Sequence, residues 1–131
     1  MADSPPAAKN SSPLRVLIVD DEPLIRWALR RGFGQRGHTV IEAGDGEETR
    51  RLVRAASFDA VILDYRLPDV QDLTLLRELI LLAPGTRVFM MTAYGDADMR
   101  ARAFEAGVQL VIDKPFQINA VVSLVESALE P

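Results

Sequence analysis

Short apolar runs alternate along the chain with longer segments in which apolar side chains recur every three or four residues. The apolar runs are rich in Val and Ile and have the length of strands. They lie at 14–19, 38–42, 59–63, 87–91 and 108–112. The longer segments have the period of amphipathic helices. They lie at 24–36, 47–56, 70–82, 96–106 and 118–129. This alternation predicts a parallel sheet with helices packed on both faces.

Acidic, hydroxyl and ammonium side chains follow most of the predicted strands. Asp20 and Asp21 follow the first strand, and Asp64 follows the third. Thr92 follows the fourth strand and Lys114 the fifth. The carboxyl ends of parallel strands share one edge of a sheet, and ligands of such folds bind at that edge. The spacing therefore predicts that these side chains meet at one site.

The acids in the segment LIVDDEP, at 17–23, predict a cation at this edge. Two carboxylates about 4 Å apart repel by about 4 kcal/mol at an effective dielectric constant near 20. Oxygen ligands without Cys or His favour Mg²⁺, Mn²⁺ or Ca²⁺ over zinc. Mg²⁺ binds few carboxylates and often a phosphate, which points to phosphoryl chemistry. Asp64 is then the candidate nucleophile, with Thr92 and Lys114 at the phosphoryl oxygens.

Composition narrows the class of protein. The 131 residues suit one domain, and a net charge of −4 argues against nonspecific nucleic-acid binding. The absence of Cys excludes disulfides and thiolate zinc sites. The apolar runs are too short to span a bilayer, and the N-terminus lacks a signal core. We therefore expect a cytoplasmic protein without membrane contact, with a disordered tail at 1–13 and a folded domain at 14–130.

Four segments together resemble the receiver domains of bacterial two-component response regulators. They are LIVDDEP at 17–23, ILDYRLP at 62–68, MMTAYG at 90–95 and DKPF at 113–116. The resemblance covers 14–130, and IRWALRR at 25–31 is similar to receivers of enhancer-binding transcription activators. It implies a flavodoxin-like (βα)5 doubly wound sheet with strand order 2-1-3-4-5. It also implies a signalling domain that catalyses only its own phosphorylation and slow dephosphorylation, rather than an enzyme.

The resemblance implies Mg²⁺-dependent (or Mn²⁺-dependent) transfer of a phosphoryl group from a sensor histidine kinase to Asp64. Asp21 would bind the metal directly, and Asp20 would act largely through water. Asp64 and the backbone carbonyl of Arg66 would complete the metal ligands from the chain.

The same resemblance implies that Thr92 and Lys114 contact the phosphoryl group and that the Lys114–Pro115 bond is cis. The phosphorylated state would alter the surface formed by the fourth helix, fifth strand and fifth helix. A second copy of the chain or a downstream effector domain would bind that surface.

Two positions depart from the pattern of the family. In the loop after Asp64, Asp69 and Asp72 stand where receivers usually have Gly. Because Asp is a favoured N-cap, Asp69 is expected to cap the third helix. Val111 stands three residues before Lys114, where receivers usually have an aromatic residue. Phosphorylation is unaffected by that change, but its readout is expected to differ, with Tyr94 as a partial replacement.

Other interpretations of the same residues are weaker. An aspartyl-nucleophile phosphatase typically has a second Asp two residues after the nucleophile, where this chain has Arg66. A flavodoxin needs a Ser, Thr or Gly phosphate loop after the first strand, where the acids of this chain would repel the phosphate. His38 is expected to be an exposed residue at a strand start rather than a metal ligand. Arg66 and Tyr94 are predicted to overhang the phosphoryl group and to slow its hydrolysis.

Overall fold

The computed structural model describes residues 13–70 and 72–130. Its strands are β1 (Arg15–Val19), β2 (Thr39–Ala43), β3 (Ala60–Asp64), β4 (Arg87–Thr92) and β5 (Leu110–Asp113). Its helices are α1 (Pro23–Gln35), α2 (Gly46–Ala55), α3 (Thr74–Leu82), α4 (Ala97–Ala106) and α5 (Ile118–Ala128). Each strand is followed by a helix, as the apolar pattern predicts. The predicted disordered tail falls almost entirely on residues 1–12, which lie outside the described part of the chain.

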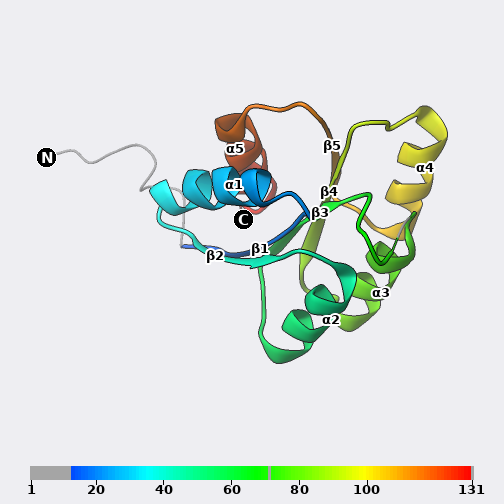
Figure 1. Cartoon of the computed structure of the whole chain (residues 1–131), viewed down its shortest axis with the longest axis horizontal. Coiled ribbons are helices and arrows are strands. Elements are labelled where there is room, and N and C mark those ends of the chain that lie inside the picture. The colour runs from blue at the N-terminus through cyan, green and yellow to red at the C-terminus, as the bar shows by residue number, and fades with distance from the viewer. Residues whose placement is uncertain (1–12, 71, 131) are drawn as a thin grey trace, which may run out of the picture.

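The sheet is parallel, and its strand order is β2-β1-β3-β4-β5. The predicted fold class is thereby confirmed. Helices α1 and α5 cover one face of the sheet, and α2, α3 and α4 cover the other (Figure 1). The strand order reverses between β1 and β3. From β1 the chain passes to β2 on one side, and it then crosses to β3 on the other side of β1. In doubly wound folds this is the place where a crevice opens at the carboxyl ends of the strands.

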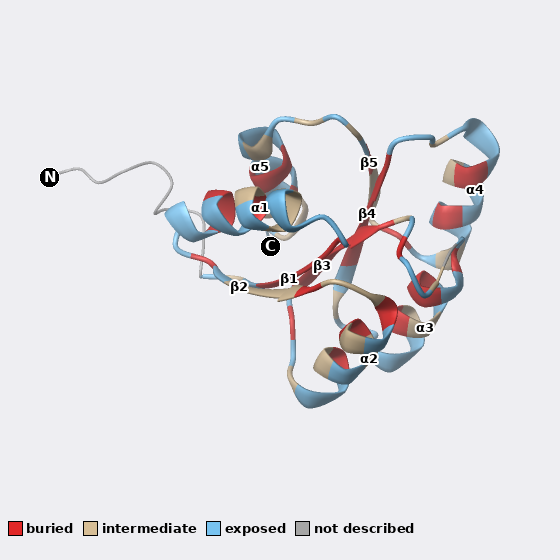
Figure 2. Cartoon of the chain, in the orientation of Figure 1, coloured by how far each residue is buried: buried red, intermediate tan, exposed pale blue. Residues whose placement is uncertain are grey.

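The central strands are buried on both faces, which explains why they read as continuous apolar runs (Figure 2). Side chains alternate between two cores along each strand. In β1, Val16 and Ile18 pack against α1 and α5, whereas Leu17 and Val19 face the opposite helices. Burial of one such side chain contributes roughly 1.5–3 kcal/mol. The two cores therefore fix the sheet and the edge where its strands end.

The loop between β3 and α3 differs from the prediction. α3 begins at Thr74 rather than at residue 70, because Asp72 adopts a left-handed conformation with φ of 58°. The Oδ1 atom of Asp72 accepts hydrogen bonds from the Thr74 amide (2.8 Å) and hydroxyl (2.7 Å). The expectation that Asp69 caps α3 is wrong, because its carboxylate bonds the first amides of α2 instead. Gln71 of this loop lies outside the described residues.

His38 is not exposed as expected, because its ring has partners from distant segments. The side chain is buried, and its Nδ1 atom accepts a hydrogen bond from the Leu14 amide at 3.0 Å. Its Nε2 atom then carries the proton and donates to the Glu126 carboxylate at 2.8 Å. His38 thus joins α5 to the start of the sheet.

No helix in the described residues is both long enough and apolar enough to traverse a bilayer.

Candidate functional site

The register of the sheet brings the predicted residues to one edge. Val19 pairs with Leu63, so that Asp20 and Asp64 are the next residues on neighbouring strands. Asp64 pairs with Met91, immediately before Thr92. Adjacent strands lie about 4.8 Å apart, and side chains that follow them in register are therefore within contact range.

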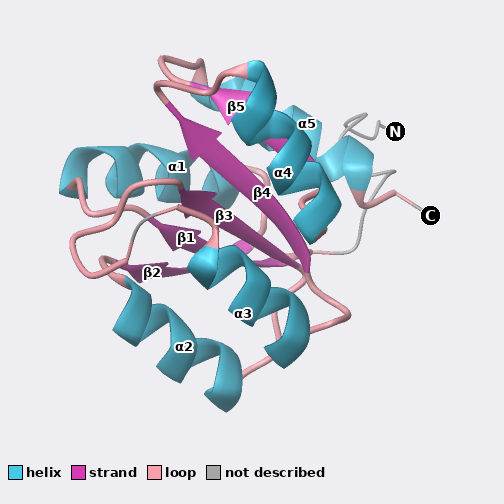
Figure 3. Cartoon of the chain, turned by 90° about the vertical axis from the view of Figure 1, so that its right-hand side faces the viewer, coloured by secondary structure: helices cyan, strands magenta, loops and turns pink. Residues whose placement is uncertain are grey.

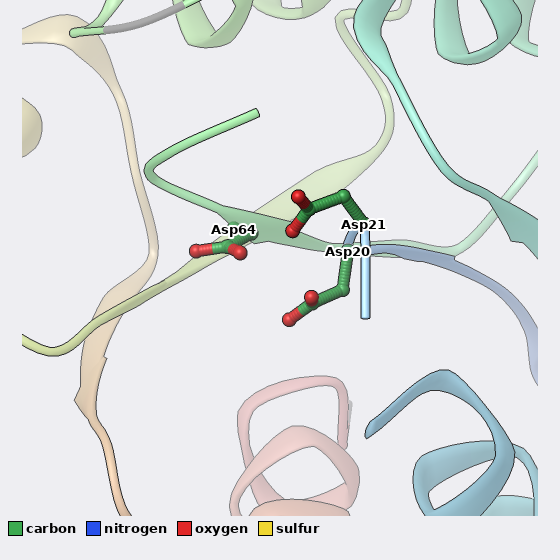
Figure 4. Close-up of side chains that lie close together, drawn as sticks. All are labelled: Asp20, Asp21 and Asp64. Carbon is green, nitrogen blue, oxygen red and sulfur yellow. The ribbon is translucent and has the colours of Figure 1, made fainter. Parts of the chain in front are cut away.

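Three carboxylates gather at this edge. Oxygen atoms of Asp20, Asp21 and Asp64 all lie within 4.8 Å of one another, and Figure 4 shows the two neighbouring strand ends that carry them. Asp20 is 0% exposed and Asp64 is 8% exposed, whereas Asp21 is open to solvent. Two acids therefore form a buried floor, and the third stands at the rim.

Lys114 holds the two buried acids together. Its Nζ atom donates to Oδ2 of Asp20 at 3.1 Å and to Oδ2 of Asp64 at 3.2 Å. Its backbone amide donates to the Thr92 carbonyl at 2.8 Å, which ties the ends of β5 and β4 together. Three carboxylates against one ammonium leave a formal charge of −2. A divalent cation matches that charge, and the all-oxygen donor set suits Mg²⁺, Mn²⁺ or Ca²⁺.

Burial and the neighbouring charge of Asp20 raise the pKa of Asp64 to about 6, although Lys114 and the Arg66 amide act in the opposite direction. For Lys114, burial lowers the pKa, but the hydrogen bonds and charges of Asp20 and Asp64 outweigh burial and raise it overall. Lys114 is therefore a permanent cation at neutral pH. A second cation beside Asp64 would favour its charged form, so cation binding and ionisation support each other.

Above the acids lies a cavity of about 370 Å³, whose lining includes Asp21, Asp64, Arg66, Thr92, Tyr94 and Lys114. Thr92 is buried, and its Oγ1 accepts a hydrogen bond from the Tyr94 amide at 3.1 Å. That contact leaves the hydroxyl proton available to donate to an acceptor in the cavity. The cavity is thus large enough for a phosphoryl-sized group, and its wall includes the Asp64 carboxylate, the Thr92 hydroxyl and the Lys114 ammonium.

Arg66 and Tyr94 lie together at the mouth of this cavity. The Cζ atom of Arg66 lies 5.2 Å from the centre of the Tyr94 ring, a cation–π distance. Tyr94 is 74% exposed, so the pair stands above the floor rather than within it. The Lys114–Pro115 peptide bond is cis, as the resemblance implied.

Two further residues at this edge contact Asp20, and sequence reasoning predicted neither contact. Arg26 donates from Nη1 to the carbonyl oxygen of Asp20 at 2.6 Å and also pairs with Glu42 at 3.1 Å. The amide of Glu22 donates to Oδ1 of Asp20 at 2.9 Å. Both contacts fix the orientation of Asp20. Local spacing in the sequence gives no signal for these contacts, because one ends on a backbone carbonyl and the other starts from a backbone amide.

Comparison with known proteins agrees with this geometry. The family model of the response regulator receiver domain matches residues 16–126. The chain is 33% identical over 114 residues to the DNA-binding transcriptional regulator NtrC of Escherichia coli (strain K12), covering 87% of this chain and 24% of NtrC. It is 31% identical over 115 residues to sporulation initiation phosphotransferase F of Bacillus subtilis (strain 168), covering 88% of this chain and 93% of that protein.

A similar solved structure is a response regulator protein from Burkholderia pseudomallei with a phosphorylated aspartic acid, calcium ion and citrate. It has a TM-score of 0.78 and 25% identity, over 87% of this chain and 71% of that chain. The chain spans about a quarter of the length of NtrC. The family match covers most of the described sheet and helices, and it confirms the resemblance found in the sequence. This chain belongs to the response regulator receiver domain family.

Proposed function

We propose that the chain accepts a phosphoryl group on Asp64 from a sensor histidine kinase, in a reaction that requires Mg²⁺ or Mn²⁺. The observation that carries this proposal is the cluster of Asp20, Asp21 and Asp64 within 4.8 Å, with Lys114 at 3.2 Å from Asp64 and an open cavity above. The phosphorylated aspartic acid and calcium ion of the Burkholderia pseudomallei structure lend support from a similar fold.

The chain's own groups have distinct tasks in this reaction. An ionised Asp64 oxygen forms a bond to phosphorus while the phosphorus–nitrogen bond of the donor phosphohistidine breaks, and the imidazole leaves and takes up a proton. The pKa of about 6 keeps Asp64 largely ionised at pH 7. The Lys114 ammonium and the Thr92 hydroxyl are placed to donate to phosphoryl oxygens. Asp20, Asp21, Asp64 and the Arg66 carbonyl would hold the cation, which supplies positive charge to the transferred group.

The proposed output is a change in the surface formed by α4, β5 and α5. Thr92 is the last residue of β4, and Lys114 follows the last residue of β5. A phosphoryl group on Asp64 would form hydrogen bonds with both side chains and so attract both strand ends. Partners for this surface are a second copy of the chain or a downstream effector domain. The chain would thus act as a signalling switch rather than as an enzyme that turns over a separate substrate.

Intact-mass measurement after incubation with acetyl phosphate and Mg²⁺ tests the proposal. The wild type should gain one phosphoryl group, and Asp64→Asn should gain none. Asp113→Asn is a matched control, because Asp113 is an acid next to Lys114 whose carboxylate pairs with Arg100 instead of joining the cluster. EDTA should abolish the gain in the wild type and in the control. Equal phosphorylation of Asp64→Asn and the wild type would refute the assignment.

A further inference from the structure

Asp69 lies in the loop between β3 and α3, and its carboxylate accepts hydrogen bonds from the first residues of α2. Its Oδ1 atom accepts from the Gly46 amide at 2.8 Å, and its Oδ2 atom accepts from the Glu47 amide at 3.0 Å. These are the first two amides of α2, which have no partner within the helix. The N–H donors lower the pKa of Asp69, so the carboxylate is ionised at neutral pH.

Helix α2 already has an N-cap residue of its own, so the role of Asp69 is not to replace an absent cap. Asp45 accepts from the Glu48 amide at 2.8 Å, as an N-cap residue usually does. Asp69 supplies a second carboxylate from 22 residues or more away in sequence. The contact joins the loop and the helix in space.

The loop packs so closely on α2 that the position needs Gly46. A Cβ atom there would lie 2.8 Å from Cγ1 of Val70 and 3.2 Å from Oδ1 of Asp69. Helices α2 and α3 lie side by side on the same face of the sheet, and the loop that enters α3 reaches the start of α2 (Figure 3). The two hydrogen bonds from backbone amides and this close packing together hold the loop against α2.

The loop held against α2 contains the proposed metal-binding carbonyl. Arg66 lies three residues before Asp69, and its amide donates to Oδ1 of Asp64 at 3.4 Å. The Leu67 amide donates to the Val70 carbonyl at 3.2 Å, which closes a turn around Asp69. The segment is therefore held at the Arg66 amide by Asp64 and at Asp69 by α2, and the Arg66 carbonyl lies between these two attachments.

We propose that Asp69 is a positioning residue that holds the loop at 65–70 against α2 and thereby keeps the Arg66 carbonyl at the cation site. This inference rests on the proposed function, because it takes that carbonyl as a ligand. Coupling between two sites is reciprocal. Cation binding at the sheet edge is therefore transmitted to the Gly46 and Glu47 amides, on a helix that supplies no ligand to the acidic cluster.

Mg²⁺ titration by calorimetry tests the positioning role. Asp69→Ala should weaken Mg²⁺ affinity by about tenfold, the lower end of the effect of residues that orient metal ligands. Asp69→Asn keeps one acceptor oxygen and should fall between the wild type and Asp69→Ala. Asp45→Ala is the control, because it removes the same charge and a cap from the same helix but leaves the loop attached. It should bind Mg²⁺ like the wild type.

Amide NMR spectra give a readout that a general loss of stability would not produce. Mg²⁺ should shift the Gly46 and Glu47 amide signals in the wild type and in Asp45→Ala, but not in Asp69→Ala. Gly46→Ala acts on the same contact from the helix side, so it provides a second variant if Asp69→Ala folds poorly, and it should weaken Mg²⁺ binding in the same direction.

Wild-type Mg²⁺ affinity in Asp69→Ala or in Gly46→Ala, or an equal loss in Asp45→Ala, would overturn the proposal. Such a result would leave the proposed function intact, provided that the variants are still phosphorylated by acetyl phosphate at saturating Mg²⁺. Absence of Mg²⁺ binding in the wild type would refute both.

Discussion

The acidic cluster should make the cation-free protein less stable as pH rises. Burial and the charge of Asp20 raise the pKa of Asp64 from 3.8 to about 6 in the folded chain. Between these two values the folded state binds more protons than the unfolded state, so the free energy of unfolding falls with rising pH. A difference of about 2 pKa units at about 1.4 kcal/mol per unit gives a loss of about 3 kcal/mol. That loss develops between about pH 4 and pH 6 and persists above pH 6.

Urea unfolding in EDTA at a series of pH values measures this effect. The test quantity is the free energy of unfolding of Asp64→Asn minus that of the wild type, since other titrating groups largely cancel in the difference. It should rise by roughly 2 to 2.5 kcal/mol from pH 4 to pH 7, which is most of the full effect. Asp113→Asn is the control, because Asp113 is a largely exposed acid outside the cluster, and its difference should not show this rise.

Saturating Mg²⁺ at pH 7 should stabilise the wild type, by about 2.7 kcal/mol at a concentration 100 times the Kd. Asp64→Asn should gain less, because it lacks one charged oxygen ligand. A difference between Asp64→Asn and the wild type that is flat or falls from pH 4 to pH 7 would refute the electrostatic reasoning. It would show that the buried pair of acids is already compensated by Lys114 alone.

Four further variants test other parts of the site and the fold. Arg66→Asn and Tyr94→Ala should each accelerate loss of the phosphoryl group, measured by intact mass over time, because the pair at the cavity mouth shields it from water; unchanged rates in both would count against shielding. Lys114→Met should raise the pKa of Asp64 above about 6, readable by NMR titration of its carboxyl, since the nearest cation is lost; a lower pKa would contradict that reasoning. His38→Ala should lower the free energy of unfolding by about 2 kcal/mol in urea, because the Leu14 amide and the Glu126 carboxylate both lose a partner; a wild-type value would show that water replaces the ring.

Sequence reasoning located the candidate site because parallel strands convert sequence order into spatial order. Asp20 and Asp64 are far apart along the chain, but each ends a strand, and the register of β1 with β3 makes them neighbours. The apolar runs were long enough to give the strands, and the family motifs gave the strand order. The roles of these residues in phosphoryl transfer stay predictions.

Contacts that depend on how loops and helices meet were beyond sequence reasoning. Asp69 was expected to cap the nearest helix along the chain, but the packing of the loop on Gly46 directs its carboxylate to α2. His38 was expected to be exposed at a strand start, but its ring is buried against Glu126, 88 residues away. Such partners are determined by how whole helices and strands pack on the sheet. The spacing of residues within one short segment does not reveal that packing.

Because Val111 stands where an aromatic residue is usual in receivers, we expect the readout of phosphorylation to lie at the strand ends. A phosphorylated Asp64 would carry roughly −1.5 to −2 units of charge in place of the single charge of its carboxylate. The Lys114 ammonium donates a hydrogen bond to Asp64, so it would have to move to reach the phosphoryl oxygens. The hydrogen bond from its backbone amide to the Thr92 carbonyl would couple that movement to β4. Tyr94 follows Thr92 by two residues and is bonded to its hydroxyl through the amide. We therefore expect the segment between β4 and α4 to carry the change.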